Sequence, residues 1–255
     1  MNRGLVDLHS HVLPGIDDGA PDLGAALELA RVAAAGGVAV LAATPHVRGD
    51  HPGVRPSELG ERCRALNERL REAAIGVEVV AGGEVDLTWS RGASDEELAL
   101  VSYRQRGSDL LVETPYGPLD GSFERDLDAL RGRGYRILLA HPERSRDLRD
   151  DRRRLERLVD EGVLVQLTAR TLVPDDSEQH RFAVGLIGGG LAHVLASDAH
   201  AATGAAPPDL ASGLDAVHVI AGRRARWMAA EAPAAILAGA QLPPAPPVDA
   251  AGEPR

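Results

Sequence analysis

Short apolar runs alternate with longer amphipathic segments along most of this chain. The apolar runs predict strands at residues 5–11, 38–43, 77–81, 109–112, 136–140, 163–167 and 193–196. Apolar residues at helical spacing predict helices at residues 21–35, 57–74, 122–133, 150–161, 210–230 and 233–238. Residues 86–108 show no consistent pattern apart from a helical segment at 96–101. The pattern therefore predicts an α/β fold of seven strand-helix units.

Several of these strands have the composition of buried parallel strands. Residues 38–43 read Val-Ala-Val-Leu-Ala-Ala, with no alternation between apolar and polar positions. Both faces of such a strand are expected to be covered, as in a parallel sheet with helices on its faces. If the units close into an α/β barrel, the carboxyl ends of all the strands surround one mouth.

Polar residues follow almost every predicted strand at that end. His9 and His11 are two residues apart in an extended segment, so their imidazoles point the same way. Asp17 and Asp18 follow in a turn flanked by glycines, which would fold a carboxylate back towards the imidazoles. Histidines and acidic residues follow the other strands in the same way: His46, Glu84, Glu113, His141, Asp198 and His200. One such residue alone would be an ordinary polar side chain at the end of a strand. Its recurrence after several strands predicts that these side chains share one site.

The residue types in this set indicate a metal centre. Its nine members are imidazoles and carboxylates, which suit borderline or hard divalent ions: His9, His11, Asp18, His46, Glu84, Glu113, His141, Asp198 and His200. They are too many for one ion, so we expect a multinuclear site. Closely spaced divalent ions lower the pKa of a bridging water and neutralise charge on a phosphoryl group. The predicted reaction is therefore phosphate ester hydrolysis by attack of a metal-bound hydroxide.

A cation for the phosphate oxygens is available next to this set. Arg144, three residues after His141, is placed to bind them in a bidentate manner. The alternative is that Arg144 belongs to the solvated arginine-rich segment that follows it. The four remaining histidines follow no predicted strand and are expected to have ordinary roles: His51, His180, His193 and His218.

Composition narrows the class of protein. A chain of 255 residues with 44% hydrophobic content predicts one domain, residues 1–242, followed by a disordered Pro- and Ala-rich tail at 243–255. The net charge of -10 argues against nucleic acid as a partner. Cys63 is the only cysteine, which excludes an intrachain disulfide and thiolate metal clusters and indicates a reducing compartment. With neither an apolar leader nor a run long enough to span a bilayer, we expect a cytoplasmic protein without membrane insertion.

Five segments of the chain also carry a family resemblance. They are DLHSHVLPGIDDGA at 7–20, ATPH at 43–46, HPER at 141–144, QLTA at 166–169 and SDAH at 197–200. In this order they resemble the polymerase-and-histidinol-phosphatase (PHP) superfamily. Within it they are most similar to the bacterial manganese-dependent protein-tyrosine phosphatases of capsule and exopolysaccharide synthesis. The resemblance implies a distorted seven-stranded TIM-like barrel, (β/α)7, and a phosphotyrosine protein as substrate, expected to be a bacterial tyrosine autokinase.

The resemblance also implies a centre of three divalent ions, expected to be manganese, with iron or zinc as alternatives. The first ion would be held by His9, His11, Glu84 and Asp198, the second by Glu84, Glu113 and His141, and the third by Asp18, His46 and His200. Arg144 matches a phosphate-binding arginine of the family, and Arg144, Asp198 and His200 are the expected catalytic residues.

Two departures from the family pattern bear on the substrate. Residues 201–207 contain no arginine, although such phosphatases usually carry a second phosphate-binding arginine there, and Asp86 lies where a basic residue is frequent. Arg48 and Arg170, each just past a strand end, are alternative sources of a second cation. A phosphatase for a small metabolite, such as histidinol phosphate, and a regulatory metal-binding module without turnover are the competing hypotheses.

Overall fold

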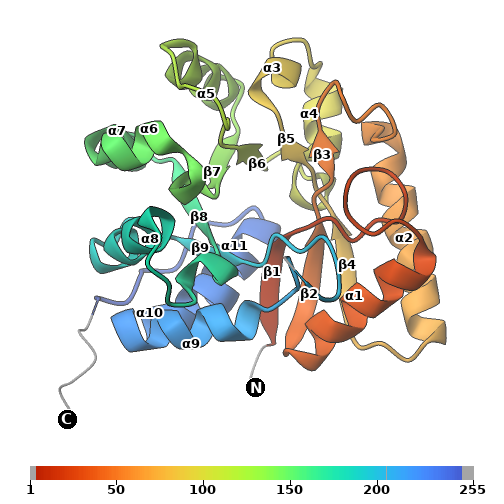
Figure 1. Ribbon diagram of the computed structural model, residues 1–255. Helices are drawn as coiled ribbons and strands as arrows, with labels where there is room; N and C mark the ends of the chain where they lie inside the picture. The colour runs from red at the N-terminus through yellow and green to blue at the C-terminus, as the bar shows by residue number, and fades with distance from the viewer. Residues whose placement is uncertain (1–3, 205, 249–255) are drawn as a thin grey trace.

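The computed structural model describes residues 4–204 and 206–248, and Figure 1 shows helices arranged around the outside of the strands. Every predicted strand is present. The described strands are β1 (Leu5–Ser10), β2 (Val38–Ala43), β3 (His46–Val47), β4 (Glu78–Ala81), β5 (Glu84–Val85), β6 (Asp109–Glu113), β7 (Arg136–Ala140), β8 (Leu164–Thr168) and β9 (Val194–Ala196). All of the strand pairs are parallel, which confirms the predicted α/β class.

The strands do not form the single closed barrel that the resemblance implied. The described strands make two sheets, one of order β1-β2-β4 and one of order β3-β5-β6-β7-β8-β9. After a gap of two residues, β2 is followed by β3 and β4 by β5, so the chain passes from the first sheet to the second just beyond the second and third predicted strands. The predicted barrel is therefore wrong as one closed sheet.

The sequence at the two gaps explains the division. Pro45 has no N–H to give to the ladder, so the β2–β4 pairing cannot continue through it. Its carbonyl still accepts a hydrogen bond from the Glu84 N–H, at 3.0 Å. At Gly83 a Cβ would lie 2.6 Å from Cγ2 of Val47 and 3.0 Å from Cβ of Val101, so the chain passes closely enough to need glycine.

The first and last strands nevertheless lie side by side. The His11 N–H donates to the Ala199 carbonyl at 2.8 Å, and the Asp198 N–H donates to the His9 carbonyl at 2.9 Å. An isolated parallel bridge joins Ser10 to Ala199. These bonds fix the ends of β1 and β9 against each other without extending either sheet.

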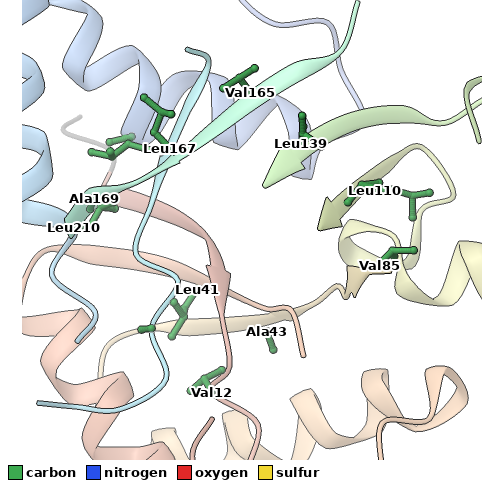
Figure 2. Packing of buried hydrophobic residues seen from close by; sticks show 14 of the residues in the cluster. Val12, Leu41, Ala43, Val85, Leu110, Leu139, Val165, Leu167, Ala169 and Leu210 are labelled. Carbon is green, nitrogen blue, oxygen red and sulfur yellow. The ribbon is translucent and has the colours of Figure 1, made fainter. Parts of the chain in front are cut away.

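The helices pack apolar stripes against the strands. They are α1 (Leu23–Ala35), α2 (Pro56–Glu72), α3 (Leu87–Ser90), α4 (Asp95–Val101), α5 (Ser122–Gly132), α6 (Arg146–Asp150), α7 (Arg152–Asp160), α8 (Glu178–Gly188), α9 (Leu210–Ala221), α10 (Arg224–Arg226) and α11 (Ala232–Leu237). Short 3-10 turns occupy Tyr103–Gln105, Pro142–Arg144 and Ala169–Leu172, and a π-helical turn occupies Trp227–Glu231. Figure 2 shows Leu110, Leu139, Val165 and Leu167 of neighbouring strands within one buried cluster.

Two local predictions differ from the structure. The helix expected at 150–161 is interrupted at Asp151, and the one expected at 210–230 ends at Gly222, whose positive φ of 52° stops α9. The helical segment expected at 96–101 is confirmed as α4, which begins with a capping box between Ser94 and Glu97.

The start of the Pro- and Ala-rich tail contacts the protein. The Pro243 carbonyl accepts a hydrogen bond from the Trp227 indole at 3.0 Å, and the Pro246 carbonyl accepts one from Arg224 at 3.2 Å. The rest of the segment expected to be disordered, residues 249–255, lies outside the described residues, and the domain boundary at 242 stays a prediction. No helix in the described part of the chain is long and apolar enough to cross a membrane.

Candidate metal centre

The two histidines of the first motif converge as the alternation in β1 requires. Nε2 of His9 and Nε2 of His11 are 3.3 Å apart, and both imidazoles are fully buried. Oδ1 of Asp198, brought in by the end of β9, lies 3.2 Å from Nε2 of His9 and 3.4 Å from Nε2 of His11. The ends of the first and last strands therefore meet in one cluster of side chains.

All nine residues expected to bind metal lie in this cluster, which we call the metal cluster. Three groups in it hold ligand atoms that all lie within 4.8 Å of one another: His9, His11 and Glu84; His46, Glu84 and Glu113; and His11, Asp18, His46 and His200. The groups overlap in Glu84, His11 and His46. They resemble the three implied ligand sets, but Asp198 is absent from the first, His46 replaces His141 in the second and His11 is added to the third.

Glu84 lies at the centre of the metal cluster. Its carboxylate is fully buried, with Oε1 2.8 Å from Nε2 of His141 and Oε2 2.9 Å from Nδ1 of His46. Oε2 is also 3.4 Å from Nε2 of His9. Burial alone would raise the pKa of Glu84, but the surrounding imidazoles outweigh it and hold the pKa well below its usual range. An ionised carboxylate shared by several ligand groups is suited to bridge two cations.

The pKa of Glu113 is shifted in the opposite direction from that of Glu84. It is buried at the end of β6, and burial together with the negative charge of Glu84 raises its pKa to about 7. Two carboxylates this close without a metal repel each other, and a divalent cation between them would relieve the repulsion. Asp18, by contrast, is 56% exposed, with Oδ1 3.5 Å from Nε2 of both His46 and His200.

Backbone strain coincides with two of these positions. His141 has a φ of 37° and Asp198 a φ of 55°, values in the left-handed region that residues with a side chain seldom adopt. His141 directly follows β7, and Asp198 lies two residues after the end of β9. Such conformations persist where the surrounding structure enforces them, and they are concentrated at functional sites.

Two residues outside the predicted ligand set position its histidines, and one of them, Asp17, lies in the turn that was expected to fold a carboxylate back towards the imidazoles. Oδ2 of Asp17 lies 2.7 Å from Nδ1 of His11, and this contact outweighs burial to lower the pKa of Asp17 to about 2. Oε1 of Gln166, in the middle of β8, lies 3.0 Å from Nδ1 of His9. Each contact engages the ring nitrogen remote from the cluster and so orients the imidazole, as partners of metal-binding histidines do. Gln166 was detectable as a lone polar residue in an apolar strand.

The donor chemistry of the metal cluster fits divalent cations. Its atoms are imidazole nitrogens and carboxylate oxygens, without thiolate, in a site that excludes most water. Oε2 of Glu84 and Nδ1 of His46 are buried and face each other, yet neither makes a hydrogen bond within the described structure. Buried polar atoms without a hydrogen bond are rare, and a bound ion would account for them.

Arg144 lies beside the metal cluster, as the sequence predicted, on the 3-10 turn that follows His141. Its Nη2 donates to Oδ2 of Asp198 at 2.5 Å and to Oγ1 of Thr168 at 3.2 Å. The side chain is still 31% exposed and lines a cavity of about 330 Å³ together with Asp198 and Arg170. A cation is thus held at the edge of the metal cluster with part of its surface open to a ligand.

Two aromatic contacts lie near the cluster. The ring of His51 is 5.2 Å from that of His46, so this histidine is next to the site although its position in the sequence did not indicate it. Tyr116 is 66% exposed, and its ring centroid is 6.4 Å from that of His141. His180 and His218 contact backbone carbonyls, and Nδ1 of His193 accepts a hydrogen bond from the Val165 N–H.

Comparison with known proteins identifies similar chains. The family model described as capsular polysaccharide synthesis, CpsB/CapC, matches residues 5–238. The tyrosine-protein phosphatase YwqE of Bacillus subtilis (strain 168) is 32% identical over 200 residues, 77% of each chain. CapC of Staphylococcus aureus is 31% identical over 206 residues, 78% of each chain.

A solved structure is similar over nearly its whole length. It is one of the crystal structures of YwqE from Bacillus subtilis and CpsB from Streptococcus pneumoniae, which are described as unique metal-dependent tyrosine phosphatases. The TM-score is 0.81 at 27% sequence identity, and the match covers 96% of this chain and 99% of the other. Dihydropyrimidinase from Brevibacillus agri NCHU1002, at 12% identity and a TM-score of 0.50, is similar in fold alone.

Proposed function

This chain belongs to the CpsB/CapC family of capsular polysaccharide synthesis, and from that premise we propose that it is a metal-dependent phosphatase that hydrolyses phosphotyrosine in proteins. The observation that carries the proposal is the convergence of nine imidazole and carboxylate residues with Arg144 at their edge. A water oxygen replaces the tyrosyl oxygen on phosphorus, which releases inorganic phosphate and the tyrosine hydroxyl.

We assign three ions to the ligand sets that the family resemblance implies. His9, His11, Glu84 and Asp198 would hold the first, Glu84, Glu113 and His141 the second, and Asp18, His46 and His200 the third. Manganese is the ion we expect, with iron and zinc as alternatives of similar ligand preference. Bound divalent ions lower the pKa of a coordinated water and neutralise charge on the phosphoryl group.

The chain's own residues would orient the substrate. Asp198 and Thr168 hold the guanidinium of Arg144 in place, so that its remaining N–H groups are directed to phosphoryl oxygens. His200, at the exposed side of the cluster, has a pKa lowered by burial and by His11, which keeps its imidazole neutral and able to bind a metal. Tyr116 supports an aryl ester as substrate, because its exposed ring lies beside His141 at the rim.

The family relationship also suggests the setting of the reaction. We infer that the substrate is a bacterial tyrosine autokinase of polysaccharide export, dephosphorylated in the cytoplasm. The relatives' connection with capsular polysaccharide synthesis supports this, and so does the single cysteine, which forms no disulfide within the chain.

Turnover with and without metal tests the proposed activity. Purified protein should hydrolyse a chromogenic aryl phosphate when manganese is added, lose the activity on chelation and regain it when manganese is restored. A phosphotyrosine peptide should be hydrolysed much faster than histidinol phosphate. Full activity of metal-free protein would refute the metal-dependent reaction, and a preference for histidinol phosphate would favour the metabolite phosphatase.

A further inference from the structure

The guanidinium of Arg144 cannot direct all of its N–H groups to a phosphoryl group, because two side chains already accept hydrogen bonds from it. Its Nη2 donates to Asp198 at 2.5 Å and to Thr168 at 3.2 Å. A phosphate monoester carries up to two negative charges and three non-bridging oxygens, and binding sites for it commonly use more than one charged donor. A second donor would therefore be expected on another side of the same cavity.

The cavity that contains Arg144 continues to a second arginine. Thr168, the hydrogen-bond partner of Arg144, is the last residue of β8, and Arg170 follows two residues later on the 3-10 turn Ala169–Leu172. Arg144, Thr168, Arg170 and Asp198 all line this cavity of about 330 Å³. Arg170 is exposed, and within the described residues its guanidinium makes no hydrogen bond or ion pair.

The backbone that carries Arg170 is held firmly. Ala169 is buried, and a Cβ added at Gly213 of α9 would lie 2.6 Å from the Ala169 Cβ. The turn and α9 are thus in close contact, and Figure 2 shows Ala169 next to Leu210, the first residue of α9. A free guanidinium on a fixed backbone loses less entropy on binding than one on a mobile loop.

The other arginine near the mouth is already paired. Arg48 forms two hydrogen bonds with Asp50, at 2.6 and 3.0 Å, and Nη1 of Arg48 lies 3.4 Å from Oε1 of Glu113. Its charge is therefore largely neutralised by two carboxylates. Residues 201–207, on the loop after His200, contain no basic residue, although Ala206 of that loop lines the same cavity as Arg170.

We propose that Arg170 is the second cationic contact to the phosphoryl group, in the cavity that Arg144 also lines. The proposal rests on the phosphatase activity proposed above and adds one residue to its substrate-binding site. Arg170 binds oxygens of the phosphoryl group itself and not a flanking part of the peptide. Its contribution therefore extends to the smallest aryl phosphates and to inorganic phosphate, the product.

The test compares Arg170→Ala and Arg170→Lys with the unchanged protein, all loaded with manganese. With a chromogenic aryl phosphate, Arg170→Ala should lower kcat/KM about 10- to 100-fold, the loss expected for one charge-assisted hydrogen bond. The affinity for inorganic phosphate, measured by calorimetry, should fall in the same variant, and lysine should restore part of both. Arg181→Ala, which removes another exposed arginine nearby on α8, is the matched control and should stay within twofold.

The possible results distinguish a failure of the role proposed for Arg170 from a failure of the proposed phosphatase activity. If Arg170→Ala keeps the unchanged affinity for inorganic phosphate, Arg170 is not a phosphoryl contact, whatever the rates. A loss with phosphotyrosine peptides but not with the small aryl phosphate would also overturn it, because it would place Arg170 in a peptide subsite. Absence of turnover in the unchanged protein would instead refute the phosphatase activity, while the calorimetric comparison would still decide the role of Arg170.

Discussion

Oε1 of Glu84 lies 2.8 Å from Nε2 of His141, while the other oxygen of the same carboxylate faces His46 at 2.9 Å. Glu84 therefore joins two sides of the metal cluster, and it belongs to two of the three ligand groups. Asp18 belongs to one group and is largely exposed. The two acidic residues should consequently differ in how many ions depend on them.

We expect Glu84→Gln to reduce the bound metal by more than one equivalent, and Asp18→Asn to reduce it by about one or less. Loss of a bridging carboxylate weakens both of the ions it would hold, whereas loss of a terminal ligand weakens one. Elemental analysis after dialysis gives the stoichiometry, with circular dichroism as a check that each variant is folded. Equal losses in the two variants would contradict the bridging role of Glu84.

Arg144→Ala should lower kcat/KM for aryl phosphates by a factor that corresponds to about 1.5 to 3 kcal/mol, or about 10- to 150-fold. The variant removes a donor to the phosphoryl group and also the partner of Asp198. Arg146→Ala is the matched control, because this arginine is only two residues away and 84% exposed. Similar rates for the two variants would remove Arg144 from the substrate site.

Cys63 should resist alkylation in the folded protein. The thiol is 4% exposed on the apolar stripe of α2, and burial raises its pKa to about 12, so almost no thiolate is present at pH 8. Treatment with iodoacetamide, followed by mass spectrometry, should show modification only after denaturation. Inactivation of the folded enzyme, with the fold retained, would assign Cys63 a role that the structure does not give it.

His193 should make the protein less stable in acid. Burial and the nearby charge of Arg224 lower its pKa from 6.5 to about 4, so the unfolded chain takes up a proton between these values while the folded state does not. Stability contributed by this group is complete above pH 6.5 and falls as the pH decreases towards 4, by up to about 3 kcal/mol.

The variant His193→Asn keeps an acceptor for the Val165 N–H and removes the titrating group. Denaturant unfolding of chelated protein should therefore show a smaller loss of stability between pH 6.5 and 4 in this variant than in the unchanged chain. Parallel pH profiles for the two proteins would show that His193 does not titrate as described.

The metal cluster was predictable because parallel strands have a simple geometry. Alternation in β1 directs His9 and His11 to one side, and histidines or acids that follow other strands reach the same mouth. The glycine-flanked turn indicated that Asp17 or Asp18 reaches the imidazoles, whereas the place of His51 depends on how its loop folds, which no periodic pattern encodes. The division into two sheets also escaped prediction, because beside Pro45 it depends on contacts of Gly83 with residues that are distant in the sequence.

Because the strands form two separate sheets, bound ions would also hold these sheets together. His9 and His11 come from the three-stranded sheet and its end, whereas His46, Glu84 and Glu113 come from the six-stranded one. An ion bound by both sets cross-links two sheets that share no ladder, beside the pair of backbone hydrogen bonds that join β1 to the end of β9. Chelation should therefore speed amide exchange at His11 and Asp198 while the ladder from β6 to β8 stays protected.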